Sequence, residues 1–147
     1  MPVTNVWDND EKTVIRMEVV GRWTWDEMYQ GSQDGYIMLE TVDNIVDAII
    51  DFSQSAGIPP NALTHARNMM GRQHPRTGVT VFIGVNAMFM SLWRAFTRVH
   101  TLFLKEQDFT FAASLDEARA LLVQRKGKRK TQIARRTQAS HASPMQE

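Results

Sequence analysis

The sequence contains no cysteine among its 147 residues. Disulfide bonds, thiolate metal sites and cysteine nucleophiles are therefore excluded, and the chain suits a reducing compartment. No uninterrupted apolar run approaches the roughly 18 residues that a membrane-spanning helix needs. Residues 1–11 are mixed and acidic, with no basic leader before an apolar stretch. We therefore expect a cytoplasmic protein without a transmembrane segment.

Acidic residues are missing from the middle of the chain. Residues 52–105 contain no Asp or Glu and six Lys or Arg, whereas residues 1–51 contain eleven carboxylates and three cations. From residue 123 onward, seven Lys or Arg accompany a single Glu. The formal net charge of +1 thus hides a strong segregation, which bears on partners and association rather than on fold.

The rest of the composition is that of a globular protein, with 43% hydrophobic and 22% charged residues. A chain of this length fits one domain and an appendage. The apolar period stops at Val123, and the residues beyond it are too polar to offset their ordering entropy by burial. We predict an α/β domain over residues 1–123 and a disordered basic tail over residues 124–147.

Apolar periodicity predicts a β-hairpin at the start of the domain and then alternating helices and strands. The predicted strands are residues 3–7, 14–20, 45–52, 79–85 and 109–113, and the predicted helices begin at residues 24, 62, 87 and 114. The second and third helices are expected to end at about Gln73 and Leu104. This order predicts the α/β class: a mixed β-sheet with an N-terminal hairpin and later parallel strands covered by about four helices.

Local signals mark the helix starts. Capping boxes are predicted at Thr24–Glu27 and Ser114–Glu117, and N-caps at Asn61 and Asn86. Two glycines, Gly31 and Gly35, fall inside the first helix, where each costs about 1 kcal/mol relative to Ala. Either this helix breaks near Gly35 or another element packs close there.

Three segments carry a resemblance to a known family. They are Gly21-Arg22-Trp23-Thr24 before the first helix, the strand end Ile49-Ile50-Asp51-Phe52-Ser53, and a closing Phe-x-x-Ser-x-Asp-Glu-Ala-x-x-x-Leu pattern over residues 111–122. With the element order, they resemble the STAS superfamily of anti-sigma-factor-antagonist-like domains over residues 3–123, and most closely its SpoIIAA-like branch. The resemblance implies a protein-interaction or small-ligand module, commonly cytoplasmic, with no chemistry and no cofactor of its own.

Phospho-switched members of that superfamily carry a Ser in an Asp-Ser-x-Gly sequence at the start of the helix after the third strand. This sequence keeps Asp51 at the strand end and has Ser55-Ala56-Gly57, but no Asp precedes Ser55. Pro59-Pro60 also separates Ser55 from the helix. The phosphorylation motif of the family is therefore not carried over intact.

Two groups of residues are candidates for binding a partner or an anion. The loop over residues 53–61 joins a strand end to a helix start, where open α/β sheets bind ligands, although its serines can simply satisfy backbone groups. Arginines of the second and third helices form one anion-attracting face if these helices are neighbours, and ordinary solvated faces if not. The candidates are Asp51, Ser53, Ser55, Asn61, Arg67, Arg72, Arg76, Arg94 and Arg98, with Lys105 beside them.

The basic tail is a third candidate. Its cations are dense enough to neutralise phosphates on nucleic acid, or to contact an acidic membrane. No aromatic residue interleaves them, so base stacking is not indicated, and a merely solubilising tail explains the same composition. The candidate contacts are Lys126, Lys128, Arg129, Lys130, Arg135 and Arg136.

Catalytic and metal sites are not indicated. The four histidines, His65, His74, His100 and His141, have no metal-ligand spacing. Asp51, Ser53 and His65 supply the residue types of nucleophilic catalysis, but the sequence has no nucleophile elbow and no P-loop. We expect no metal and no cofactor.

The third predicted helix has more apolar residues than one buried stripe requires, including Met88, Met90 and Leu102. They indicate a homo-oligomer or partner interface, or a helix that is buried on two sides. We therefore predict a non-catalytic regulatory module that binds a protein partner through its second and third helices and the 53–61 loop. The alternative is an anion-binding protein that docks on nucleic acid or acidic lipid through the arginines and the tail.

Overall fold

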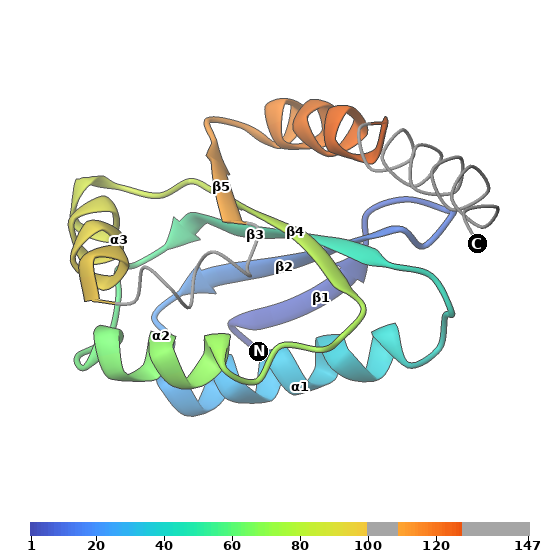
Figure 1. Cartoon of the computed structure of the whole chain (residues 1–147). Helices are drawn as coiled ribbons and strands as arrows, with labels where there is room; N and C mark the ends of the chain where they lie inside the picture. Colours follow the sequence, from blue (N-terminus) through green and yellow to red (C-terminus); the bar gives the residue numbers. More distant parts are fainter. Residues whose placement is uncertain (100–108, 128–147) are drawn as a thin grey trace, which may run out of the picture.

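The computed structural model describes residues 1–99 and 109–127, which form one mixed sheet with helices on both faces (Figure 1). The sheet order is β1-β2-β3-β4-β5; β1 is antiparallel to β2, and the other neighbours are parallel. The elements are β1 (Val3–Trp7), β2 (Val14–Gly21), α1 (Trp25–Leu39), β3 (Val46–Ser55), α2 (Ala62–Met70), β4 (Thr77–Ile83), α3 (Ala87–Val99) and β5 (Phe109–Ala112). A last helix covers residues 115–127. The predicted α/β class is confirmed.

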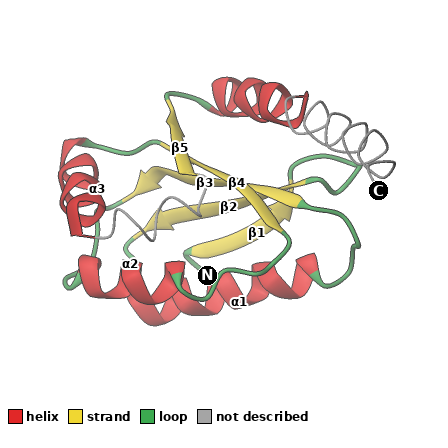
Figure 2. Cartoon of the chain, viewed as in Figure 1, coloured by secondary structure: helices red, strands yellow, loops and turns green. Residues whose placement is uncertain are grey.

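The two faces of the sheet carry different helices, as Figure 2 shows. Helices α1 and α2 lie along one face, and the last helix lies on the other. Because strands β2 to β5 are neighbours in chain order, crossovers of one hand place their helices on one face. The face under α1 is filled around Met17, Val19 and Met28. The opposite face packs Ile49 and Val81 against Ala118 and Leu122 of the last helix.

Strand β1 explains why α1 tolerates two glycines. The helix continues unbroken to Leu39, and β1 packs directly against it: a Cβ built on Gly31 would lie 2.3 Å from Cγ1 of Val3, and one on Gly35 would lie 3.1 Å from Oδ1 of Asn5. Asn5 also donates a hydrogen bond to the carbonyl of Gly31 (2.8 Å). Of the two alternatives, the close approach of another element is therefore the one observed.

Several predicted boundaries are wrong by a few residues. Strand β3 continues to Ser55, three residues beyond the predicted end, because β2 runs to Gly21 and pairs with it there. Helix α2 ends at Met70 rather than at Gln73, because the chain turns at Gly71. The predicted extension of α3 to Leu104 lies outside the described residues. The last helix continues to residue 127, four residues past the predicted domain boundary.

Three of the four predicted caps are observed. Thr24 and Glu27 form the reciprocal capping box of α1, Asn86 accepts a hydrogen bond from the backbone of Phe89 (2.9 Å), and Ser114 accepts one from the backbone of Glu117 (3.2 Å). Asn61 precedes α2 but makes no capping hydrogen bond, because it adopts a left-handed conformation (φ 66°). The prediction of a side-chain cap at Asn61 is therefore wrong.

Candidate functional site

The most distinctive feature of the molecule is a cavity of about 210 Å³ between the sheet and helices α1, α2 and α3. The wall that residues 1–99 and 109–127 form is almost entirely apolar, and none of its residues is Asp, Glu, Lys, Arg or His. Ligand sites are typically concave and apolar with a few placed polar groups. This space has that chemistry, and sequence reasoning did not identify it.

The floor of the cavity is a row of side chains on adjacent strands. Met17 of β2 pairs with Ile50 of β3, which pairs with Phe82 of β4, so their side chains project from the same face of the sheet. Ile50 remains only half-buried although β3 is the central strand. Helices α1, α2 and α3 therefore cover this part of the sheet but leave the cavity between themselves and the strands.

Aromatic rings form one wall. Phe82, which is 7% exposed, lies at the centre, and the rings around it come from β3, α3 and β5. Their centroids lie 5.5–6.4 Å from that of Phe82, and they belong to Phe52, Phe89, Trp93, Phe109 and Phe111. All of these except Phe111 line the cavity. Such rings supply large apolar contact area and accept offset or edge contacts from a further ring.

Helix α2 contributes small residues where the aromatic wall faces it. Ala62 and Ala66 lie one helical turn apart and both line the cavity. Leu63 also lines it and yet is 43% exposed, so it marks the rim. One signal in the sequence could have indicated the cavity. Ala62 and Ala66 lie on the apolar side of α2, while the strands and α3 carry more aromatic residues than one buried stripe requires.

The end of the cavity nearest the α2–β4 loop has three polar residues, and Asn5, Ser32 and Thr80 also line the cavity. Tyr36 of α1, Gln73 and Thr77 all line it. Burial raises the pKa of the Tyr36 phenol. The hydroxyl of Thr77 is buried and has no hydrogen-bond partner among residues 1–99 and 109–127.

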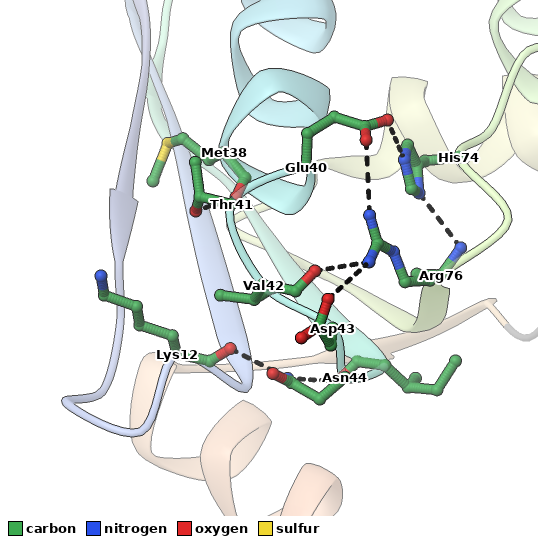
Figure 3. Close-up of polar contacts among 10 residues, drawn as sticks. Lys12, Met38, Glu40, Thr41, Val42, Asp43, Asn44, His74 and Arg76 are labelled. Carbon is green, nitrogen blue, oxygen red and sulfur yellow. Dashed lines mark hydrogen bonds and ion pairs between the residues drawn. The ribbon is translucent and has the colours of Figure 1, made fainter.

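A polar clamp, formed by Glu40, His74 and Arg76, lies next to Gln73 in the α2–β4 loop (Figure 3). Glu40, just after α1, contacts Nε2 of His74 (2.7 Å) and Nη2 of Arg76 (3.5 Å). Arg76 also donates to the carbonyl of Val42, and its backbone N–H donates to Nδ1 of His74 (3.1 Å). The hydrogen bond with His74, followed by the charge of that ring, lowers the pKa of Glu40. The clamp ties the loop after α1 to the loop after α2.

Two tryptophans hold the predicted 53–61 loop at the opposite end. The indole N–H of Trp23 is shared between Oγ of Ser55 (2.9 Å) and the carbonyl of Gly57 (3.0 Å). That of Trp25 donates to the carbonyl of Pro60 (2.8 Å). Ser55 also donates to the carbonyl of Gly57 (2.9 Å), so its hydroxyl is engaged on both sides.

Asp51 and Ser53 form a local pair. Both the backbone N–H (2.8 Å) and the hydroxyl (2.5 Å) of Ser53 donate to Oδ1 of Asp51. Gly84 passes very close: it has a φ of +71°, and a Cβ there would lie 2.2 Å from the nitrogen of Ser53. Asp51 lies on the sheet face of Ile49, which packs under the last helix.

His65 is not part of this pair. Its ring stacks on that of Trp25, with centroids 4.9 Å apart, and its Nδ1 shares a hydrogen bond with the hydroxyl of Tyr29 (2.8 Å).

The candidate arginines have different surroundings. Arg72 lies over the ring of Tyr29, 5.8 Å from its centroid, and Arg76 belongs to the clamp. Arg67, Arg94 and Arg98 are exposed. Helices α2 and α3 are in contact, but two of the three arginines at α2 and its exit turn toward α1 rather than toward a face shared with α3.

The other predicted contacts lie in the tail or beside it. Lys126 is exposed on the last helix. The remaining predicted tail contacts, Lys128, Arg129, Lys130, Arg135 and Arg136, lie outside the described residues, as does Lys105. Within the part of the chain that the structure describes, no three carboxylates or histidines are placed to hold a metal ion, and no helix is long and apolar enough to cross a membrane.

A scan of the sequence against models of protein families finds no match, and a search of curated proteins finds none either. We therefore infer a function from the residues of the site alone.

Proposed function

We propose that this protein is a non-catalytic binding module that holds an uncharged apolar small molecule in the cavity between its sheet and helices α1 to α3. The observation that carries the proposal is the 210 Å³ of apolar space in whose wall the described part of the chain places no ionisable side chain. An engineered protein cavity of about 150 Å³ is sufficient to bind benzene. A substituted ring or a short acyl chain is therefore the size of ligand expected.

Binding of a ligand in this space is expected to stabilise the fold. The apolar wall would remove apolar ligand surface from water, which favours binding by about 25 cal/mol per Å². A ligand that binds the folded chain and not the unfolded chain raises the stability of the folded state.

Titration of the full chain with propylbenzene tests the proposal, followed by tryptophan fluorescence and by the unfolding temperature. We expect saturable quenching, because Trp23, Trp25 and Trp93 line the cavity, and a rise in the unfolding temperature. Ala66→Phe places a ring in the cavity and should abolish both effects. Ala120→Phe adds the same ring at an exposed position on the last helix and should leave both unchanged.

Two results would contradict this function. One is an absence of saturable binding by the wild-type chain. The other is equal binding by the Ala66→Phe and Ala120→Phe variants, which would place the ligand elsewhere on the surface.

A second candidate function is recognition of a protein partner, as the STAS resemblance implies for a cytoplasmic regulatory module. The supporting observation is that α2 and α3 expose three arginines, Arg67, Arg94 and Arg98, together with the apolar side chains of Leu63 (43% exposed) and Met88 (60% exposed). Tightly packed partner interfaces combine such apolar and Arg contacts. The cavity lies beneath these helices.

Charge reversal tests the second function. The Arg94→Glu/Arg98→Glu double variant should lose a partner that the wild-type chain retains from nuclease-treated lysate. Retention that survives rising salt would favour a protein interface, whereas retention that collapses with salt would favour acidic lipid. Retention that occurs only when the nuclease is omitted would favour nucleic acid. Unchanged retention by the double variant would remove these arginines from the interface.

A further inference from the structure

Three of the polar residues that line the cavity, Tyr36, Gln73 and Thr77, lie toward its α2–β4 end. Thr77 is the first residue of β4, and its backbone N–H donates to the carbonyl of His74 (3.0 Å). The His74 ring contacts the ring of Tyr36, with centroids 6.0 Å apart, and Gln73 is its neighbour in the chain. Tyr36, Gln73 and Thr77 thus meet around His74, away from the rings of Phe52 and Phe89.

Thr77 supplies an independent sign of a missing partner. Its hydroxyl is buried without a hydrogen bond to any residue that the structure describes. Buried polar groups are almost always paired in native proteins, and an exception calls for an explanation. Because Thr77 lines the cavity, a polar atom of a ligand at this end is the explanation that the site itself offers.

The same end excludes a charged ligand group. Among the residues that the structure describes, no cation or anion lines the cavity, and burying an unpaired charge is strongly unfavourable. The nearby ionisable side chains of the clamp are already paired, since Glu40 contacts both His74 and Arg76. The raised pKa of Tyr36, caused by burial, indicates the same low-dielectric surroundings and keeps the phenol a neutral donor.

We infer that the ligand is a neutral amphiphile: an apolar body that packs among the aromatic rings and one uncharged hydroxyl or carbonyl group that is received by Tyr36, Gln73 and Thr77. This inference rests on the proposed function and adds the chemical class of the ligand and its orientation. The apolar body lies toward Phe82, and the polar group lies toward the α2–β4 loop.

Three matched probes test the inference: propylbenzene, 4-propylphenol and 4-propylbenzoate, each titrated into the full chain at pH 7. A net hydrogen bond contributes about 0.5–1.5 kcal/mol. We therefore expect 4-propylphenol to bind about two- to tenfold more tightly than propylbenzene. We expect 4-propylbenzoate to bind more weakly than either.

A variant identifies the receiving residue. Thr77→Val keeps the side-chain shape and should reduce the preference for the phenol to less than about twofold, with propylbenzene affinity unchanged. Since the hydroxyl is unpaired, this variant should also unfold at or above the wild-type temperature. Thr110→Val is the matched control, because Thr110 pairs with Val81 of the opposite core; its preference for the phenol should equal that of the wild-type chain.

The outcomes distinguish a failure of the proposed binding function from a failure of the ligand class inferred here. If no probe binds, the proposed function fails. If propylbenzene binds as tightly as 4-propylphenol, or if Thr77→Val keeps the preference, binding stands but the polar end is wrongly assigned. Tightest binding of 4-propylbenzoate would overturn the neutral character of the ligand.

Discussion

Arg119 of the last helix donates hydrogen bonds to both carboxylate oxygens of Asp8, which follows the first strand and lies 111 residues earlier in the chain. Nε of Arg119 donates to Oδ2 and Nη2 donates to Oδ1, each at 2.9 Å. Arg16 contacts the same carboxylate, whose side chain is only 4% exposed. This pairing fastens the last helix to the N-terminal hairpin, on the sheet face opposite the cavity.

We predict that Asp8→Asn lowers the free energy of unfolding by about 1–2 kcal/mol, because a nearly buried carboxylate loses charge-assisted bonds to two arginines. Arg119 is 44% exposed, which keeps the effect below that of a fully buried pair. Urea titration measures the loss. Asp116→Asn is the control: this partner of Arg119 is 97% exposed and 3.8 Å away, and its loss should change little.

The same carboxylate predicts a pH dependence of stability. Hydrogen bonds from Arg119, with further contributions from its charge and from Arg16, hold the pKa of Asp8 below its ordinary value of 3.8. Because the folded-state pKa is depressed, this contribution is present above the unfolded value and is lost as pH falls through the folded-state pKa. The stability difference between wild type and Asp8→Asn should therefore shrink between about pH 5 and pH 2. A difference that stays constant over this range would contradict the assignment.

The contact between α1 and β1 predicts that Gly31→Ala is destabilising although alanine favours helices. The new Cβ would lie 2.3 Å from Cγ1 and 3.0 Å from Cβ of Val3, so strand or helix must shift. We expect a net loss of about 1–2 kcal/mol, since overpacking exceeds the gain in helix propensity. Gly127→Ala meets nothing within 4 Å and should not be destabilising. Thermal unfolding of both variants decides the point.

We predict that Trp23→Phe loosens the backbone of residues 55–58, which the Trp23 indole N–H holds in place. This change removes the donor shared by Ser55 and Gly57 and leaves acceptors to be satisfied by water. Amide hydrogen exchange should become faster within residues 55–58 before the rest of the sheet is affected. Trp7→Phe removes an indole that packs in the separate cluster around Ile15, and exchange in residues 55–58 should remain at the wild-type rate.

Local features were predictable from the sequence. The capping box of Thr24 and the N-cap of Ser114 were correct because donor and acceptor are only three residues apart. The reciprocal half of the predicted box at Ser114 differs, because Glu117 accepts from the backbone N–H of Ala113. The parallel strand β4 was recognisable because its five residues from Val79 to Ile83 are all buried, which requires a continuous apolar run. Asn61 was misassigned because its left-handed backbone depends on how the whole loop is held by Trp23 and Trp25.

The sequence by itself determined the α/β class, the order of the elements and the segregation of charge, since these follow from short-range periodicity and composition. Only the tertiary structure decided that Phe82 of β4, Ala66 of α2 and Trp93 of α3 border one unfilled space, and that Asp8 meets Arg119. The physical reason is that a cavity, like a long-range ion pair, is a property of side chains from several elements at once. Its volume depends on how far α2 and α3 stand from the sheet, and no periodicity within one segment encodes that distance.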